Sequence, residues 1–365
     1  MGPLAKSFID FGDGSEDGST RLDITHQLEN LQFQALSKGL EIYPFLRLAR
    51  PVRIFSQADK VSQAWISAIP TSMSHIPSLE FSEIMAAFLA LPSPACQSLV
   101  GTKLLQSGRL VDDFGDNIMC EKLPFDTWRT RHDQAKLAIE ELATDAGVVV
   151  QPEVFGLFSP LIPSVATSEG GMLSWSRDRQ GLVPDFLFTF PAHYGANVCQ
   201  IAELKFISAG ATYYRKTEKS VDFRARQLPR LYREKAKKID QKYNNCQNGN
   251  TGPVERKLES LGELQCLVLG QFGEASQDLH ILLEKLSHLK AQCVGRSLGR
   301  PVSDHERALF LHQYRRKLGI TAVHSQAQCM PVREEAEKDR ADRVAHWAAH
   351  VRGRGLLTRG GLHLH

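Results

Sequence analysis

The sequence predicts a mixed α/β fold: a central sheet with flanking helices, a small helical subdomain before it and a helical tail after it. Two observations predict this class. Four short apolar runs, over residues 148–158, 182–190, 197–207 and 264–272, have the length and composition of strands. Helical patterns precede the first run, separate the third from the fourth and follow the last, which gives the order α-β-β-β-α-β-α.

The beginning of the chain predicts a mobile terminus followed by a helix. Residues 11–20 are acidic and rich in Gly and Ser, a composition typical of segments that bury little apolar surface, so residues 1–22 are expected to be disordered. Residues 28–48 hold enough Leu and Phe to be helical.

The region up to residue 125 predicts one further helix and irregular structure. A helix over about residues 80–90 follows from the helical spacing of Ile84, Phe88 and Leu91, with a stop at the two prolines Pro92 and Pro94. Residues 100–127 have no regular pattern. We therefore expect residues 23–125 to form a small helical and irregular subdomain.

Residues 126–297 predict the α/β domain. Its first helix, in RHDQAKLAIEELATDAG, ends at Gly147 and carries one apolar stripe made of Ala135, Ala138, Ile139, Leu142 and Ala146. A long basic helix follows the third strand, and Pro229 within it predicts a kink or a restart. The last helix covers about residues 276–292. Residues 298–365 predict a helical basic tail with a frayed end.

Composition and charge narrow the class of protein. The 365-residue chain has 42% hydrophobic and 23% charged residues, which is ordinary for a globular protein and excludes disorder throughout. Its seven cysteines include no CxxC pair, which favours reduced thiols. An apolar signal region and a membrane-length apolar run are not evident. We expect a nuclear or cytoplasmic protein that is not secreted and has no membrane partner.

The most informative stretch lies in the second and third strands. The chain's single Pro-Asp pair ends at Asp185, and after seventeen intervening residues Glu203, Leu204 and Lys205 follow within an apolar frame. Because side chains alternate along a strand, Glu203 and Lys205 point to the same face. If the two strands are neighbours, Asp185 joins them at one end of the sheet. Two close carboxylates favour a divalent cation, and hard oxygen ligands suit Mg²⁺ or Mn²⁺.

This pattern resembles the PD-(D/E)xK nuclease superfamily, also called the restriction-endonuclease-like fold, over roughly residues 126–295. The resemblance implies that Asp185 and Glu203 bind the metal and that Lys205 assists the hydrolytic water. Members often place a further ligand on the first helix, which makes Glu140, Glu141 and His132 candidates. RecB-like members also carry a Gln and a Tyr separated by three residues after the ExK strand. Here Gln227 and Tyr232 are separated by four, and Gln227 is a candidate to contact the metal-bound water or a phosphate.

The segment before the domain is similar to the C-terminal region of non-LTR retrotransposon proteins, in which a cysteine/histidine knuckle precedes a restriction-like endonuclease. Cys96 and Cys120 match two of its cysteines, the second early cysteine is missing, and Asn117 stands where a histidine is expected. Because tetrahedral zinc needs four good ligands, this knuckle is expected to have lost its metal. The resemblance implies that the chain derives from a mobile element.

The charge distribution indicates a nucleic-acid partner. Between residues 215 and 242 there are eleven Lys or Arg against four acidic residues, although the whole chain has a net charge of only +3. Two tyrosines, Tyr213 and Tyr214, could stack on an unpaired base. The candidate phosphate contacts are Arg215, Lys216, Arg224, Arg226, Arg230 and Arg233. We expect DNA as the partner, with RNA as the alternative.

Three functions remain open from the sequence. The first is a metal-dependent endodeoxyribonuclease that uses Asp185, Glu203, Lys205 and Gln227. The second is a nucleic-acid-binding protein of the same fold without turnover, and the third is an interaction protein in which the basic helix is incidental. The structural alternative for the motif is an edge strand whose Glu203 and Lys205 pair in solvent, with Asp185 as a turn carboxylate. A second ExK triplet, at Glu255 and Lys257, shows that the triplet alone is not specific.

Overall fold

The computed structural model describes most of the chain beyond residue 58. The described residues are 59–67, 76–89, 91–121, 127–154, 156–162, 182–191, 198–208, 219–244, 246–247 and 249–359. By its internal contacts the chain divides into Met1–Pro51 and Val52–His365, and everything described below belongs to the second unit. The expected N-terminal disorder and the helix expected over 28–48 lie outside the described residues.

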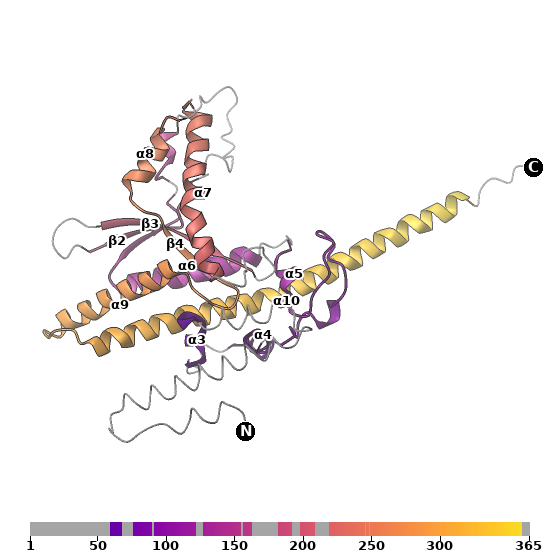
Figure 1. Ribbon diagram of the computed structural model, residues 1–365. Coiled ribbons are helices and arrows are strands. Elements are labelled where there is room, and N and C mark those ends of the chain that lie inside the picture. Colours follow the sequence, from indigo (N-terminus) through magenta and orange to yellow (C-terminus); the bar gives the residue numbers. More distant parts are fainter. Residues whose placement is uncertain are drawn as a thin grey trace, which may run out of the picture. The chain divides into compact units, whose positions relative to one another are not determined.

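A four-stranded mixed sheet forms the centre of this unit (Figure 1). Its strands are β1 (Val149–Pro152), β2 (Phe186–Phe190), β3 (Val198–Phe206) and β4 (Gln265–Leu269), in that spatial order. β1 and β2 are antiparallel, β2 and β3 are antiparallel, and β3 and β4 are parallel. The predicted mixed α/β class is confirmed. The charged strand β3 lies inside the sheet, so the alternative of an edge strand is wrong.

Three helices cover one face of the sheet: α6 (Thr127–Asp145), α9 (Gln277–Ser297) and α10 (Asp304–Arg359). The core beneath them takes Phe186 and Phe188 from β2 and Ala202 and Leu204 from β3, all of them buried. The predicted alternation along β3 is therefore confirmed for the apolar face. The predicted end of α6 is also found, because Gly147 has a φ of 77°, a conformation that glycine adopts without a steric penalty.

The other face is covered by α7 (Ser220–Tyr243) and α8 (Pro253–Ser260), with the short 3₁₀ helix η4 (Ser159–Leu161) beside them. Ile201 of β3 and Val268 of β4 meet the apolar stripe of α7 in a second core. α7 runs without interruption through Pro229, so the expected restart is wrong. Leu228 and Tyr232 are buried on either side of the proline, and their packing offsets the one backbone hydrogen bond that proline cannot make.

The N-terminal part of this unit packs on α10 and on the beginning of α9. It comprises α3 (Lys60–Ala64), η2 (Trp65–Ser67), α4 (Ser78–Phe88), η3 (Gln97–Leu99) and α5 (Asp116–Met119). α4 confirms the helix predicted over about 80–90. The Asp59 carboxylate caps α3 by accepting from Val61 N at 2.8 Å, and its other oxygen lies 2.7 Å from His280 Nε2 of α9. None of the described helices combines the length and the apolar character needed to cross a membrane.

The two cysteines compared with a zinc knuckle lie in this N-terminal part. The Cys96 thiol is buried, donates to Met330 Sδ at 3.3 Å, and has its pKa raised by burial to about 12. Burial also raises the pKa of Cys120. The Asn117 side chain, at the position expected for a histidine, donates to Leu110 O at 2.8 Å. Both cysteines are thus protonated thiols at neutral pH rather than thiolates.

Candidate active site

The sheet fixes Asp185 against the C-terminal part of β3. The β2–β3 ladder ends at the pair of Phe186 with Ala202, and β3 continues beyond it to Phe206. The Leu204 N–H therefore has no strand partner in β2, and it donates to Asp185 Oδ2 at 2.8 Å. The Asp185 carboxylate thus replaces the main-chain acceptor that a neighbouring strand would supply. Its partner, Leu204, lies between Glu203 and Lys205 in the sequence.

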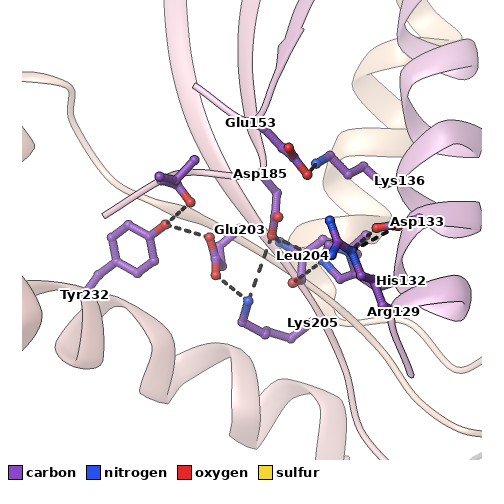
Figure 2. Close-up of polar contacts among 11 residues, drawn as sticks. Arg129, His132, Asp133, Lys136, Glu153, Asp185, Glu203, Leu204, Lys205 and Tyr232 are labelled. Atoms are coloured by element: carbon purple, nitrogen blue, oxygen red, sulfur yellow. Dashed lines mark hydrogen bonds and ion pairs between the residues drawn. The ribbon is translucent and has the colours of Figure 1, made fainter. Parts of the chain in front are cut away.

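The three predicted charges converge at this point (Figure 2). Lys205 Nζ forms an ion pair with Glu203 Oε1 and lies 4.0 Å from Asp185 Oδ2. The Glu203 residue is only 7% exposed, whereas the Lys205 side chain is 37% exposed. The predicted convergence is confirmed. Glu203 and Lys205 do pair with each other, but the carboxylate lies under α7 and not in solvent.

His132 joins the cluster from α6. Its Nε2 lies 3.5 Å from Asp185 Oδ2 and 3.3 Å from Leu204 O, and its Nδ1 lies 3.4 Å from Asp133 Oδ1. One imidazole therefore contacts both the Asp185 carboxylate and the backbone of β3. Among the residues proposed from the first helix, His132 is the one that the structure brings to Asp185.

Glu141 lies elsewhere. It is nine residues beyond His132 on α6, a rise of roughly 13 Å along a helix, and its carboxylate pairs with Lys317 of α10 at 2.6 Å. The structure does not bring Glu141 to the two carboxylates, because the turn of α6 that faces Asp185 is the one that carries His132.

Tyr232 of α7 reaches Glu203 from the opposite side. Its hydroxyl donates to Glu203 Oε2 at 2.6 Å and lies 3.3 Å from Val183 O. Gln227 precedes Tyr232 by five residues, which turns it about 140° around the helix, and it accepts from Arg224 Nη1 at 3.2 Å. The changed spacing noted in the sequence therefore separates the two side chains, and Tyr232 is the one at the carboxylates.

The basic residues of α7 divide between two flanks of the helix. Arg226, Arg230 and Arg233 are exposed and follow one another at helical spacing on one stripe. Arg230 pairs with Glu234 at 2.8 Å. Tyr213, Tyr214, Arg215 and Lys216 lie outside the described residues.

Lys235 lies on the flank of α7 that faces the site. It follows Arg233 by two positions, a rotation of about 200° around the helix. Burial lowers the pKa of Lys235, Glu203 opposes this shift, and Lys205 adds to it. Lys235 therefore experiences the charges of the site. Sequence analysis missed it among eleven basic residues, and its spacing of three from Tyr232 is the signal that could have found it.

A second lysine–carboxylate pair borders Asp185. Lys136 Nζ of α6 lies 2.7 Å from Glu153 Oε1 (Figure 2). Glu153 N donates to Asp185 O at 3.0 Å. Sequence analysis passed over both residues. Lys136 is one turn beyond His132 and so shares its face of α6, whereas nothing in the sequence places the end of β1 beside the Pro-Asp pair.

The two carboxylates differ in their affinity for protons. Burial and the charge of Asp185 raise the pKa of Glu203, against the opposing effects of Lys205 and Tyr232. Burial also acts to raise the pKa of Asp185, but His132, Lys205 and the Leu204 N–H outweigh it, and the pKa is lowered. Burial acts to lower the pKa of His132, but the contact with Asp185 outweighs it, and the pKa of His132 is raised. Asp185 is thus the stable anion of the pair.

The oxygens present fit a hard divalent cation. Within the part of the chain described here, no group of three or more His, Cys, Asp or Glu side chains is arranged to enclose a metal ion. Asp185 and Glu203, however, both face the Lys205 ammonium, so a positive charge already stands within reach of both. Carboxylate oxygens of this kind suit Mg²⁺ or Mn²⁺, which are commonly held by one or two carboxylates together with water.

Comparisons with known protein families, with characterised protein sequences and with solved structures found no match to this chain.

Proposed function

We propose that this protein is a metal-dependent endonuclease that hydrolyses phosphodiester bonds of DNA. The observation that carries the proposal is the convergence of Asp185, Glu203 and Lys205 on an inner strand, where charged side chains have no role in packing. Burying charge costs free energy, and clusters of this kind concentrate at functional sites.

Each residue has a defined task in this proposal. Asp185 and Glu203 would hold the cation, which when bound would polarise the phosphate and lower the pKa of a water molecule. Lys205, the most exposed of the three, would leave its pairing with Glu203 and present its ammonium to the water and to the negative charge that develops on the phosphoryl oxygens. His132 would orient Asp185, and Tyr232 would orient Glu203.

The order of elements supports the nuclease reading. α6, β1, β2, β3, α7 and β4 follow the α-β-β-β-α-β order that the resemblance to the PD-(D/E)xK superfamily implies, with α8 added before β4. We take this order as support for a restriction-endonuclease-like core, and the link to non-LTR retrotransposon proteins remains part of the same proposal.

The test is nicking of supercoiled plasmid by the purified protein in Mg²⁺, in Mn²⁺ and in EDTA. We expect nicking in either metal and none in EDTA, with a loss of at least about 100-fold in Asp185→Asn and in Lys205→Ala, since each removes a group that acts on the reacting phosphate. Nicking that is insensitive to EDTA, or equal in wild type and Asp185→Asn, would contradict the proposal.

A second candidate, nucleic-acid binding without turnover, is favoured by a different observation. Arg226, Arg230 and Arg233 form an exposed stripe that is separate from the carboxylate cluster. It would bind phosphates whether or not catalysis occurs, with an affinity that falls as salt increases. Binding that persists in Asp185→Asn without any nicking by wild type would favour this function, and binding without salt dependence would favour neither.

A further inference from the structure

Lys136 and Glu153 form an ion pair in which one side chain is much more buried than the other. The Lys136 side chain is 9% exposed, whereas the Glu153 side chain is 45% exposed. The ammonium is thus removed from water, while the carboxylate that balances its charge remains partly hydrated and weakens the attraction.

Glu153 also has an unfavourable backbone conformation. Its φ of 46° makes it the one non-glycine residue with positive φ among those that the structure describes. A left-handed conformation brings Cβ close to the backbone and is rare for a glutamate. Outliers of this kind persist where the surroundings hold them, and they are enriched at functional sites.

Both features act on the backbone of the Pro-Asp pair. The β1–β2 ladder ends at the pair of Pro152 with Phe186, and the turn of the chain at Glu153 then adds two further hydrogen bonds. Glu153 N donates to Asp185 O at 3.0 Å, and Val154 N donates to Pro184 O at 3.2 Å. The salt bridge to Lys136 ties this turn to α6, one helical turn from the imidazole that contacts Asp185.

Stability does not account for this arrangement. An ion pair with one hydrated partner contributes little to stability, and a glycine would relieve the conformation at Glu153. What the arrangement does achieve is a fixed position for Asp185, whose main chain is held by Glu153 and whose carboxylate is held by His132 and Leu204.

We propose that Lys136 and Glu153 are positioning residues that lock the Asp185 backbone in the geometry needed to bind the divalent cation. This inference rests on the proposed function, because it assigns to Asp185 the role of a cation ligand. Neither residue contacts the reacting atoms. Both act through the main chain of Asp185, so their loss should change how tightly the cation is held more than the rate once it is bound.

The experiment measures the Mn²⁺ dissociation constant of the purified full chain by electron paramagnetic resonance, for wild type, Lys136→Met and Glu153→Gln. Glu153→Gln is the second variant because its side chain is half-exposed, so the substitution leaves the packing of the core unchanged. Asp185→Asn is the reference for loss of a ligand. Lys290→Met is the matched control, since Lys290 also joins α6 to a neighbouring element, through Asp145 at 2.6 Å.

We expect Lys136→Met and Glu153→Gln each to weaken Mn²⁺ binding about tenfold, as removal of groups that orient metal ligands commonly does, and Lys290→Met to bind as wild type. In the nicking assay the Mn²⁺ concentration for half-maximal rate should rise by the same factor, with the rate at saturating Mn²⁺ nearly unchanged. A merely structural role would not produce this split between the two parameters.

Two outcomes overturn the inference in distinguishable ways. If Asp185→Asn loses Mn²⁺ while Lys136→Met and Glu153→Gln bind as wild type, the positioning role is wrong and the proposed function stands. If wild type does not bind Mn²⁺, or Asp185→Asn binds as wild type does, the cation site itself is wrong and both proposals fall.

Discussion

At the residue scale, one hydrogen bond from Tyr232 fixes the orientation of Glu203, a proposed cation ligand. The phenol donates to Oε2, so Oε1 is left to face Lys205. The bond also favours the ionised carboxylate, against the burial that raises the pKa of Glu203. Because the hydrogen bond already holds the Glu203 side chain in one rotamer, binding of a cation would cost less conformational entropy.

Tyr232→Phe should therefore weaken the cation site. We expect about tenfold weaker Mn²⁺ binding, because Glu203 loses both its orientation and a donor that favours its anionic form. Calorimetric titration of Mn²⁺ into wild type and variant measures the effect.

Tyr314→Phe is the control for that experiment. Tyr314 donates to Asp145 Oδ2 at 2.7 Å, a bond of the same kind and length at the far end of α6. Both variants should lose stability of the order of 1 kcal/mol. Equal Mn²⁺ affinity in Tyr232→Phe and Tyr314→Phe would show that the phenol has no part in binding the cation.

At this scale the sequence predicted that the charges of the second and third strands meet, but not which side chains of the neighbouring elements join them. Asp185, Glu203 and Lys205 could be placed together because strand alternation and one neighbour relation suffice. Lys136, Glu153 and Tyr232 could not, since their positions depend on how α6 and α7 are rotated against the sheet. That rotation is decided by packing of both cores.

Among the elements, α7 combines three tasks on three sides. One stripe is buried against the sheet, and it places Tyr232 at Glu203. A second flank places Lys235 near the site, and the third carries Arg226, Arg230 and Arg233 in solvent. A basic helix read from sequence alone is uniformly suited to phosphates, whereas in the structure the exposed Lys235 lies on the flank next to Tyr232 and the three arginines lie on another flank.

This separation predicts different effects for the two flanks. The triple variant Arg226→Gln, Arg230→Gln and Arg233→Gln should weaken DNA binding and reduce the slope of log affinity against log salt by about 2 to 3, if each arginine neutralises one phosphate. Lys235→Gln should leave that slope within about 1 of wild type and instead lower the rate of nicking at saturating DNA, because Lys235 lies in the field of Glu203 and Lys205.

Fluorescence anisotropy over a salt series and single-turnover nicking measure the two quantities. Arg296→Gln, an exposed arginine near the end of α9, serves as the control for removing positive charge. A slope unchanged in the triple variant would remove the stripe from the DNA interface, whatever happens to the rate.

The lengths of the strands illustrate what local pattern cannot supply. Residues 148–158 predict one long strand, but only Val149–Pro152 pairs with β2. The apolar residues after it serve another purpose, since Phe158 is buried in the second core with η4 beside it. The apolar run therefore predicted correctly that its residues are buried, but it predicted a strand for residues that lie in a turn. Apolar residues are buried in both kinds of structure, so the run alone does not distinguish them.

For the whole molecule, α10 shows why the domain plan was harder to predict than the sheet. Residues 298–365 have mixed charge and no strong apolar stripe, which favours a tail. Tyr314, Leu318 and Ala322 are nevertheless buried in the core that covers the first face of the sheet, and Ala327 is buried against α4. The buried residues of α10 do recur at helical spacing, but buried polar side chains such as Ser325, Gln326 and Arg333 stand among the apolar ones and hide the stripe in the sequence.

The stability of the whole molecule should also reflect the site, through Glu203. A carboxylate whose folded pKa is raised above its unfolded value holds its proton more tightly in the native state, so its contribution to stability falls as pH rises from the unfolded pKa through the folded one. Glu203→Gln cannot ionise and does not lose this contribution.

We expect the variant to match wild type in acid and to be more stable by about 1 kcal/mol at neutral pH, as is common when an active-site strain is removed, while losing nicking. Urea unfolding in EDTA over a series of pH values from acid to neutral measures the difference. Glu259→Gln, an exposed carboxylate on α8, is the control and should show no such pH dependence. A Glu203→Gln variant that is less stable than wild type at the higher pH would mean that the ion pair with Lys205 contributes more than the burial of Glu203 costs, and that the site is built for stability rather than for binding a cation.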